Sequence, residues 1–352
     1  MSALCAPRRP SPRPMPLFKD LPLRPPIEPM EAKSIKEIPL GKDWLYEPKW
    51  DGFRCIAFRD GTDIALQSKS GQPLERYFPE IVDALKTLTA DAFILAGELT
   101  IELDGKLDFD AILQRIHPAE SRVKQLSAET PAIYAVFDAL ALEEQSKLYE
   151  DPLKKRRTRL EAFAAKYFKK NVRLALSPST TDVKIARAWF TGGLAHFDGV
   201  IAKQLDEPYH FGDRNAVVKI KRVYTADCVV GGFRLAKDGK TIASLLLGLY
   251  DDAGLLHLVG FVGSMSAYER ARAAELLEPI VEGPGFTGAQ PGGPSRWGSR
   301  EAQWHPVAPR IVVEVQYDRV TGDRFRHGAR LLRWRSDKAP RQCTMEQMVR
   351  SG

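Results

Sequence analysis

The sequence contains only four cysteines, Cys5, Cys55, Cys228 and Cys343, and no two of them lie close together. It therefore lacks the short cysteine spacings of a zinc site and the paired cysteines of a small secreted scaffold. The six histidines show no metal-ligand spacing either. These absences exclude zinc-finger and disulfide-stapled proteins and favour a reducing, cytoplasmic compartment.

Long hydrophobic runs are also absent. No apolar stretch approaches the roughly 20 residues that a membrane-spanning helix requires, so we expect no membrane partner. The first residues lack the apolar centre of a secretory signal. Residues 1–26 instead carry eight prolines, five basic residues and one acid. That composition predicts a flexible basic tail outside any core.

The net charge of +7 is small for 352 residues, and it is unevenly distributed. Residues 310–341 carry nine basic and four acidic side chains, and residues 1–26 add a further excess of basic groups, so the rest of the chain is slightly acidic. A uniformly basic polyanion-binding protein is thereby excluded. The two basic segments would suit contacts with DNA phosphates, which weaken with salt. The alternative is that the positive balance serves only solubility.

The most informative segment is Glu47–Arg54, with the sequence EPKWDGFR. A lysine followed by Asp-Gly and then by arginine is typical of a covalent nucleotidyltransferase. The amine of Lys49 can attack the α-phosphorus of a nucleoside triphosphate only where burial or nearby cations favour its neutral form. Asp51 could hold the lysine, Gly52 would allow a tight turn beside the ligand, and Arg54 could bind a phosphate or ribose oxygen. The alternative is a half-buried strand that begins with an incidental lysine.

Two apolar runs downstream each contain a side chain that needs an explanation. Glu98 interrupts the run 93–101, and a buried carboxylate is costly unless it binds something such as a ribose hydroxyl or a metal ion. Phe137 lies in the strand-like run 134–140 and could stack on a purine. Each residue alone is equally compatible with an ordinary strand.

Three charged motifs follow these runs. The segment 198–203 has an acid and a glycine at its start and a lysine at its end, around a short apolar core. Lys219 and Lys221 are spaced by two residues, so both point to the same face of a strand. The segment 333–338 contains three cations and one acid. The fixed order of all these motifs is much more informative than any one of them.

Together and in this order, the motifs resemble those of the ATP-dependent DNA ligases, and more narrowly the small stand-alone bacterial ligases of the ligase C type. The resemblance extends from about Pro29 to Pro340. It implies that Lys49 is the adenylated lysine and that Glu98 and Asp198 bind the metal ion, Mg²⁺ or Mn²⁺. The positions that it assigns to nucleotide binding are Glu47, Arg54, Lys69, Glu98, Phe137, Lys203, Lys219, Lys221, Arg335 and Lys338.

The resemblance also implies individual roles. Glu47 would contact adenine, Glu98 would contact the ribose and Phe137 would lie against the face of the base. Lys203, Lys219 and Lys221 would bind phosphate. Two positions depart from the family pattern. Lys69 stands where arginine is usual, and lysine cannot form a bidentate fork. Asp198 stands where glutamate is more common, and its shorter side chain changes the reach to a metal ion.

The fold that the resemblance implies is α+β. An adenylation (nucleotidyltransferase) domain of antiparallel sheets flanked by helices is followed by an OB-fold barrel. The expected parts are a basic proline-rich tail, the adenylation domain, the OB-fold domain and a C-terminal tail, at residues 1–26, 27–224, 225–341 and 342–352.

Local patterns predict where the main helices lie. The sequence predicts helices over residues 78–87, 151–168, 182–189 and 266–277, and the second of them opens with an acid before a first-turn proline. The basic residues between 154 and 159 are expected to form a solvated face of the second of these helices.

The function that the resemblance implies is the sealing of nicks in double-stranded DNA with ATP, through a lysine–AMP intermediate and an adenylated 5′-phosphate, in DNA repair. The expected partners are nicked double-stranded DNA and a DNA-end-binding repair protein, and the enzyme is expected to be a nucleoid-associated monomer. Three alternatives remain open at this point. They are a GTP-dependent RNA-capping guanylyltransferase, an RNA ligase and a DNA-binding module that has lost catalysis.

Overall fold

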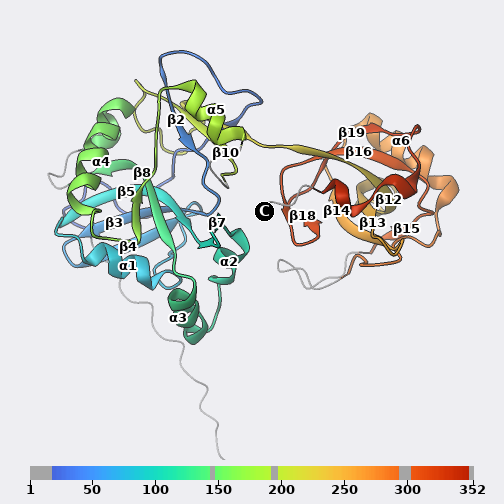
Figure 1. The fold of residues 1–352 in the computed structure, drawn as a ribbon, viewed down its shortest axis with the longest axis horizontal. Coiled ribbons are helices and arrows are strands. Elements are labelled where there is room, and N and C mark those ends of the chain that lie inside the picture. The colour runs from blue at the N-terminus through green and yellow to red at the C-terminus, as the bar shows by residue number, and fades with distance from the viewer. Residues whose placement is uncertain (1–17, 143–146, 192–196, 293–302, 349–352) are drawn as a thin grey trace, which may run out of the picture. The chain divides into compact units, whose positions relative to one another are not determined.

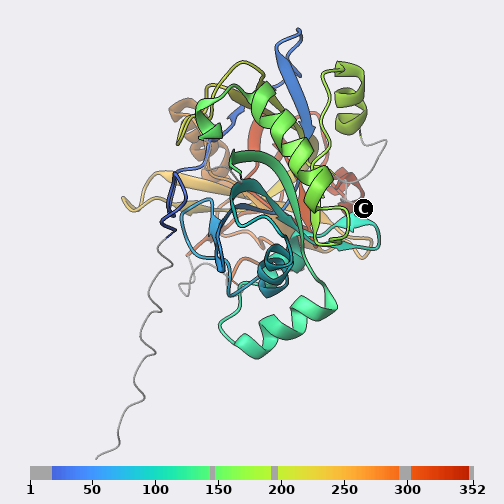
Figure 2. The ribbon, with the colours of Figure 1, turned by 90° about the vertical axis from the view of Figure 1, so that its left-hand side faces the viewer.

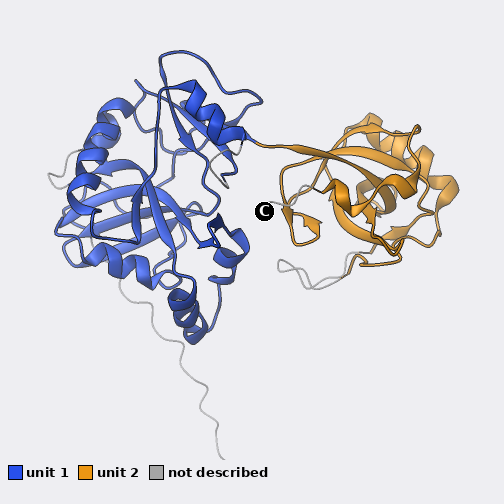
Figure 3. Ribbon diagram, viewed as in Figure 1, with its two compact units in different colours: residues 1–221 blue, residues 222–352 orange. Residues whose placement is uncertain are grey.

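The structure is a computed structural model that describes residues 18–142, 147–191, 197–292 and 303–348. The chain folds into two compact units, residues 1–221 and 222–352 (Figures 1 and 3). The boundary follows strand β11 (Val217–Lys221) and precedes strand β12 (Tyr224–Leu235), slightly earlier than the expected boundary after residue 224.

The larger sheet of unit 1 has five strands in the order β4-β3-β5-β8-β9. Strands β4, β3, β5 and β8 pair antiparallel, whereas β9 runs parallel to β8, and the middles of the three central strands are buried because helices cover one face. That face packs on α1 and α4 through side chains such as Ile81, Leu85, Leu160 and Phe163. The bounds are β3 Phe53–Asp60, β4 Asp63–Ser68, β5 Ala92–Thr100, β8 Ile133–Ala141, β9 Leu174–Leu176, α1 Pro79–Lys86 and α4 Leu153–Tyr167.

The smaller sheet of unit 1 has four strands in the order β1-β11-β10-β2. Helix α5 (Val183–Thr191) covers one face, where Ala186 and Trp189 pack on Tyr46 and Val200. The other face carries the alternating polar residues that line the candidate site. The remaining bounds are β1 Lys33–Ser34, β2 Trp44–Pro48 and β10 Gly199–Gln204.

Short elements complete unit 1. Strands β6 (Glu102–Leu103) and β7 (Lys106–Leu107) form a hairpin that leads into helices α2 (Phe109–Gln114) and α3 (Glu120–Glu129). Helix α3 lies at the lower edge of the unit in both views (Figures 1 and 2). Throughout the described ranges, none of the helices combines the length and apolar character that crossing a membrane demands.

Residues 18–26 differ from the expected tail. Phe18 and Leu21 are buried, and the ring of Phe18 lies 6.0 Å from that of Phe58 on the second face of the five-stranded sheet. Farther along, the backbone of Met30 donates a hydrogen bond to the Tyr209 hydroxyl at 3.0 Å. The segment packs because its few apolar side chains cover the face of the sheet opposite α1 and α4, together with Ile56, Phe58 and Ile94. Residues 1–17 of the expected tail lie outside the described residues.

Helix α4 corrects the prediction of a solvated basic face. The Arg156 side chain is fully buried and binds both oxygens of the buried Asp138, at 2.9 and 3.0 Å. Arg157 is also buried, whereas Lys154 and Lys155 are exposed as expected. The helix thus carries both buried and solvated cations. Arg156 is buried because the carboxylate of Asp138 in strand β8 needs a cation within the core.

Unit 2 is built on an antiparallel sheet in the order β14-β13-β12-β16-β19, with β15 paired to β12. Helix α6 begins at a capping box in which Ser266 and Glu269 satisfy each other's backbone amides. In the part of unit 2 that the structure describes, β14 and β19 are not paired, so the expected barrel is not closed. The bounds are β13 Ile242–Tyr250, β14 Leu256–Val262, α6 Ala267–Leu277, β15 His305–Pro306, β16 Val312–Tyr317, β17 Val320–Thr321, β18 Arg324–Phe325 and β19 Arg330–Trp334.

The end of the chain is not a free tail as far as residue 348. Cys343 and Met348 are buried in the core of unit 2, and the Tyr250 amide donates to the Cys343 carbonyl at 2.8 Å. Two short 3₁₀ helices, Pro340–Gln342 and Met345–Gln347, carry this segment across the sheet. Residues 349–352 lie outside the described residues.

The Asp138–Arg156 pair generates a stability prediction. Replacing Arg156 with methionine leaves Asp138 buried without its cation, so the free energy of unfolding should fall by about 3–5 kcal/mol. The exposed Lys155→Met change on the same helix should cost less than about 0.5 kcal/mol. Urea unfolding of both variants measures the difference, and equal stabilities would contradict a structural role for the buried pair.

Candidate active site

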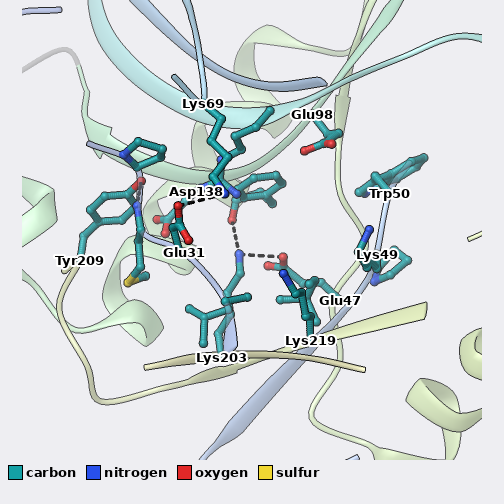
Figure 4. Close-up of a pocket in the computed structure, with 18 residues that line it drawn as sticks. Glu31, Glu47, Lys49, Trp50, Lys69, Glu98, Asp138, Lys203, Tyr209 and Lys219 are labelled. Carbon is teal, nitrogen blue, oxygen red and sulfur yellow. Dashed lines mark hydrogen bonds and ion pairs between the residues drawn. The ribbon is translucent and has the colours of Figure 1, made fainter. Parts of the chain in front are cut away.

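The candidate site is a cavity of about 250 Å³ between the two sheets of unit 1 (Figure 4). Side chains reach it from both sheets and from the segment 29–32. The sequence-predicted residues that line it are Glu47, Lys49, Arg54, Lys69, Glu98, Phe137, Lys203 and Lys219. The structure therefore brings together residues that are up to 172 positions apart in the sequence.

Strand register arranges the floor of the cavity in rows. Ile201 on the central strand β10 lies opposite Glu47 on β2 and Lys219 on β11. The adjacent row on the same face contains Lys203, and the row on the other side contains Lys221 opposite Gly199. Since alternate residues share a face, the four-stranded sheet presents its charged side chains along one axis.

Lys49 immediately follows strand β2 and is held there by the chain of Asp198. Its amide donates to the Gly199 carbonyl at 3.0 Å, and its carbonyl accepts from the Asp198 amide at 2.9 Å. The Lys49 ammonium lies 2.6 Å from the Asp198 carboxylate, and the Lys221 ammonium lies 3.8 Å from the same oxygen. The Asp198 carboxylate thus holds the amines of Lys49 and Lys221 close together, and both amines are expected to face phosphate.

Gly52 is required by the packing of two segments of backbone. A Cβ at this position would collide with the carbonyl of Leu99, so the glycine permits strand β5 to approach the chain after Lys49. The expected turn of Gly52 beside a ligand stays a prediction. Trp50 is fixed nearby, because its indole N–H donates to the Ser177 hydroxyl at 2.9 Å.

Glu98 projects from strand β5 opposite Arg54 on β3. Loss of hydration on burial raises the pKa of Glu98 to about 7, although Lys49 and Arg54 both act to lower it. The carboxyl group is thus poorly solvated in the protein alone and would gain most from a ribose hydroxyl or a metal ion.

Phe137 lies at an irregularity of strand pairing. Asp138 pairs with Ala96 and Val136 pairs with Gly97, which leaves Phe137 without a partner on β5. Such a bulge re-aims a side chain. The Arg54 guanidinium lies 4.3 Å from the ring centroid of Phe137, and the Lys203 ammonium lies 4.4 Å from it.

Lys203 contacts both the ring of Phe137 and the carboxylate of Glu47. Its ammonium is 2.7 Å from Glu47 Oε2 and is buried, and loss of hydration lowers the pKa of Lys203. The other carboxylate oxygen, Glu47 Oε1, is buried without a hydrogen bond, and so is Nη1 of Arg157, 3.6 Å away. Lys203 thus lies against the ring of Phe137 and the carboxylate of Glu47, and its expected phosphate-binding role stays a prediction.

Lys69 and Lys219 have contrasting surroundings. The exposed Lys69 pairs at 2.9 Å with Glu31, which also pairs with Arg214. No carboxylate among the described residues lies within ion-pair distance of Lys219. Partial burial and then Lys221 lower the pKa of Lys219. A ligand phosphate would supply the missing anion.

Arg335 and Lys338 belong to unit 2, where both bind the carboxylate of Asp227. Both residues were expected in the second domain. Within unit 2, the Asp227 carboxylate holds their side chains close together.

A divalent ion fits the carboxylates beside Lys49 only with help from a ligand. No group of three or more acidic, histidine or cysteine side chains in the described part of the chain could hold a metal ion alone. Glu98 and Asp198 both interact with Lys49. Two carboxylates completed by phosphate oxygens and water are a usual arrangement for Mg²⁺.

Known proteins share these motifs and this architecture. The family description "ATP dependent DNA ligase domain" matches residues 29–221, and "ATP dependent DNA ligase C terminal region" matches residues 238–338. The chain belongs to the ATP-dependent DNA ligase family. The chain is 44% identical to "DNA ligase C1" of Mycolicibacterium smegmatis, over 94% of this chain and 95% of that protein.

Two further relatives agree with this assignment. "DNA ligase C" of Mycobacterium tuberculosis is 41% identical over 94% of this ligase and 96% of its own length. A solved structure from a study of Lig E DNA ligases has a TM-score of 0.54 at 18% identity, and the match covers 88% of this ligase and 99% of that chain. Because the identity is low, the likeness to that solved structure supports the fold alone, which is an adenylation domain followed by an OB-fold domain. The assignment favours a DNA ligase over a capping enzyme, an RNA ligase or an inactive module.

Several residues of the ligase cavity were not predicted from the sequence. Asp138, Tyr209 and the segment Met30–Glu31 line it as well. Asp138 carried a usable signal, since a lone acid in the apolar run 134–140 requires a buried cation. The segment 29–32 carried none, because its position depends on contacts with residues far along the chain.

The raised pKa of Glu98 predicts a pH dependence of stability. The folded protein holds the Glu98 proton up to about pH 7, whereas the unfolded chain holds it only up to the ordinary glutamate pKa of 4.5, so wild-type stability falls as pH rises between these values. Glu98→Gln removes this loss. In EDTA, its stability relative to wild type should therefore be greater at pH 8 than at pH 4.5, by up to about 3 kcal/mol.

The matched control is Glu102→Gln, which changes an exposed carboxyl on the neighbouring strand β6. Urea unfolding at the two pH values should give the same difference from wild type for this control. A Glu98→Gln difference that is also independent of pH would show that Glu98 is ionised normally.

Proposed function

We propose that this ligase seals nicks in duplex DNA through an AMP group carried on Lys49. In the first step the Lys49 amine attacks the α-phosphorus of ATP, a P–N bond forms and pyrophosphate leaves. A 5′-phosphate oxygen of the nick then attacks the same phosphorus and releases the lysine. Finally the 3′-hydroxyl attacks the adenylated 5′-phosphate, the phosphodiester forms and AMP leaves. The observation that carries the proposal is the position of Lys49 in a cavity with Lys219 and beside Asp198 and Lys221.

The axis of charges in the cavity supports one orientation of ATP. The base would lie at Phe137, where Glu47 and Lys203 face its hydrogen-bonding edge and Arg54 would have to leave the ring. The phosphates would lie toward Lys49, Lys219 and Lys221, with the ribose near Glu98. Amines fixed in this way would stabilise negative charge that develops on the transferring phosphoryl group.

Asp198 and Glu98 would hold a divalent ion, Mg²⁺ or Mn²⁺, together with phosphate oxygens. When bound, such an ion would supply positive charge opposite the phosphates, and Asp198 would hold that ion instead of the Lys49 amine. The residues Arg335 and Lys338 of unit 2 would grip the β- and γ-phosphates and orient the leaving pyrophosphate in line.

Nicks arise where repair synthesis or end rejoining leaves one unjoined bond, and we place the enzyme in DNA repair for that reason. Its partner is nicked double-stranded DNA, and a DNA-end-binding repair protein is the protein partner that we propose. Binding to DNA would weaken with salt, because it rests on phosphate contacts.

The first prediction on activity separates the steps. Lys49→Ala should abolish nick sealing with ATP, because no amine is present to take up AMP. The same variant should still seal a nick whose 5′-phosphate already carries AMP, since the last step does not use the lysine carrier. Gel assays on the two substrates measure this, and sealing of the ordinary nick by Lys49→Ala would remove the residue from its proposed role.

The second prediction concerns the base. Glu47 Oε1 makes no hydrogen bond and lies 3.6 Å from the Arg157 guanidinium, and it would accept a hydrogen bond from the adenine amino group and repel the guanine carbonyl oxygen. Glu47→Gln offers an amide N–H to that oxygen, so the preference for ATP over GTP in enzyme–AMP or enzyme–GMP formation should fall about tenfold or more. Glu120→Gln, an exposed change on α3, is the control. A preference unchanged by Glu47→Gln would place base selection elsewhere.

A further inference from the structure

A single buried carboxylate holds the two motif cations of unit 2. Asp227, on strand β12, accepts hydrogen bonds from Arg335 Nη1 at 2.9 and 3.1 Å and from Lys338 Nζ at 2.7 Å. Its side chain is only 12% exposed. Because one carboxylate binds both groups, it fixes the distance between the guanidinium and the ammonium.

The C-terminal segment holds Asp227 in turn. The side chain of Gln347 accepts a hydrogen bond from the Asp227 amide at 3.1 Å and donates one to the Asp227 carbonyl at 3.3 Å. Gln347 lies in the 3₁₀ helix between the buried residues Cys343 and Met348. A segment that the sequence suggested was a tail therefore supports the cation pair.

The other edge of the Arg335 guanidinium pairs with Asp337, a partner that a phosphate could replace. Its Nε and Nη2 bind the two oxygens of Asp337 at 2.8 and 2.9 Å, and Asp337 is 64% exposed. An exposed ion pair of this kind contributes little, whereas the buried pair with Asp227 is much harder to exchange. The Lys338 ammonium makes one hydrogen bond to the described residues and has donors left for a phosphate.

We propose that Asp227 is a positioning residue for the first step of the reaction: it presents Arg335 and Lys338 as one rigid, bidentate receptor for the departing pyrophosphate. The inference rests on the proposed role of these two cations toward the β- and γ-phosphates. Cations that are fixed beforehand need no reorganisation when charge moves to the leaving group. Asp227 itself does not touch the nucleotide.

Asp227→Asn tests the proposal, because the amide can hold only one cation firmly and removes one negative charge. Single-turnover formation of enzyme–AMP should show a maximal rate lower by about tenfold or more. The half-saturating ATP concentration should not rise, since the site has lost a charge that repels ATP. Sealing of a pre-adenylated nick, which releases no pyrophosphate, should stay within about twofold of wild type.

Two further variants make the result decisive. Gln347→Ala should slow adenylation in the same direction but less, because it loosens only the backbone of Asp227. Asp251→Asn, a paired carboxyl elsewhere in unit 2, should leave both steps unchanged. An unchanged maximal adenylation rate in Asp227→Asn, or an equal loss in both steps, would overturn the proposal.

The companion variant Arg335→Ala separates this inference from the proposed function. Slow adenylation in Arg335→Ala together with normal adenylation in Asp227→Asn would refute the positioning role alone. Normal adenylation in both would refute the role of the motif cations as well.

Discussion

The ion pair between Lys49 and Asp198 is the interaction on which the rest of the site depends. It joins the end of strand β2 to the start of strand β10, and two backbone hydrogen bonds between the same segments hold it in register. The strands β2 and β10 then bring Glu47 and Lys203 together, and β11 adds Lys219 and Lys221. The order of the strands in this sheet thus places the amines of Lys49, Lys219 and Lys221 at one end of the cavity. It places the Glu47–Lys203 pair at the other end.

A cavity with so many charges is stable only because most of the buried ones are paired. The Asp138–Arg156 pair and the Glu47–Lys203 pair lie in the wall of the cavity and are almost inaccessible to water. Cavity groups that lack a full set of partners include Glu98, Lys219 and Glu47 Oε1, which makes no hydrogen bond. These are the groups that a nucleotide with a metal ion would satisfy, so we infer that ligand binding completes the charge balance.

Sequence patterns predicted those parts of the structure that depend on local periodicity. The helix starts near residues 79, 153, 183 and 267 and the shared face of Lys219 and Lys221 follow from local spacing. The burial of Phe18 and the support of Asp227 by Gln347 could not be predicted in this way. Each depends on a partner 40 or more residues away, and composition alone suggested two tails. Arg156 was misjudged because its partner, Asp138, lies on a strand of the five-stranded sheet, 18 residues earlier in the chain.

The most direct test of the account is to locate AMP on the protein. The purified ligase should be incubated with ATP and a divalent metal, and its intact mass and proteolytic peptides then compared with those of the untreated protein. The account predicts one added AMP per chain, on the Lys49 side chain, which is lost again when pyrophosphate is supplied. An AMP group on another residue, or none after treatment with ATP, would contradict it.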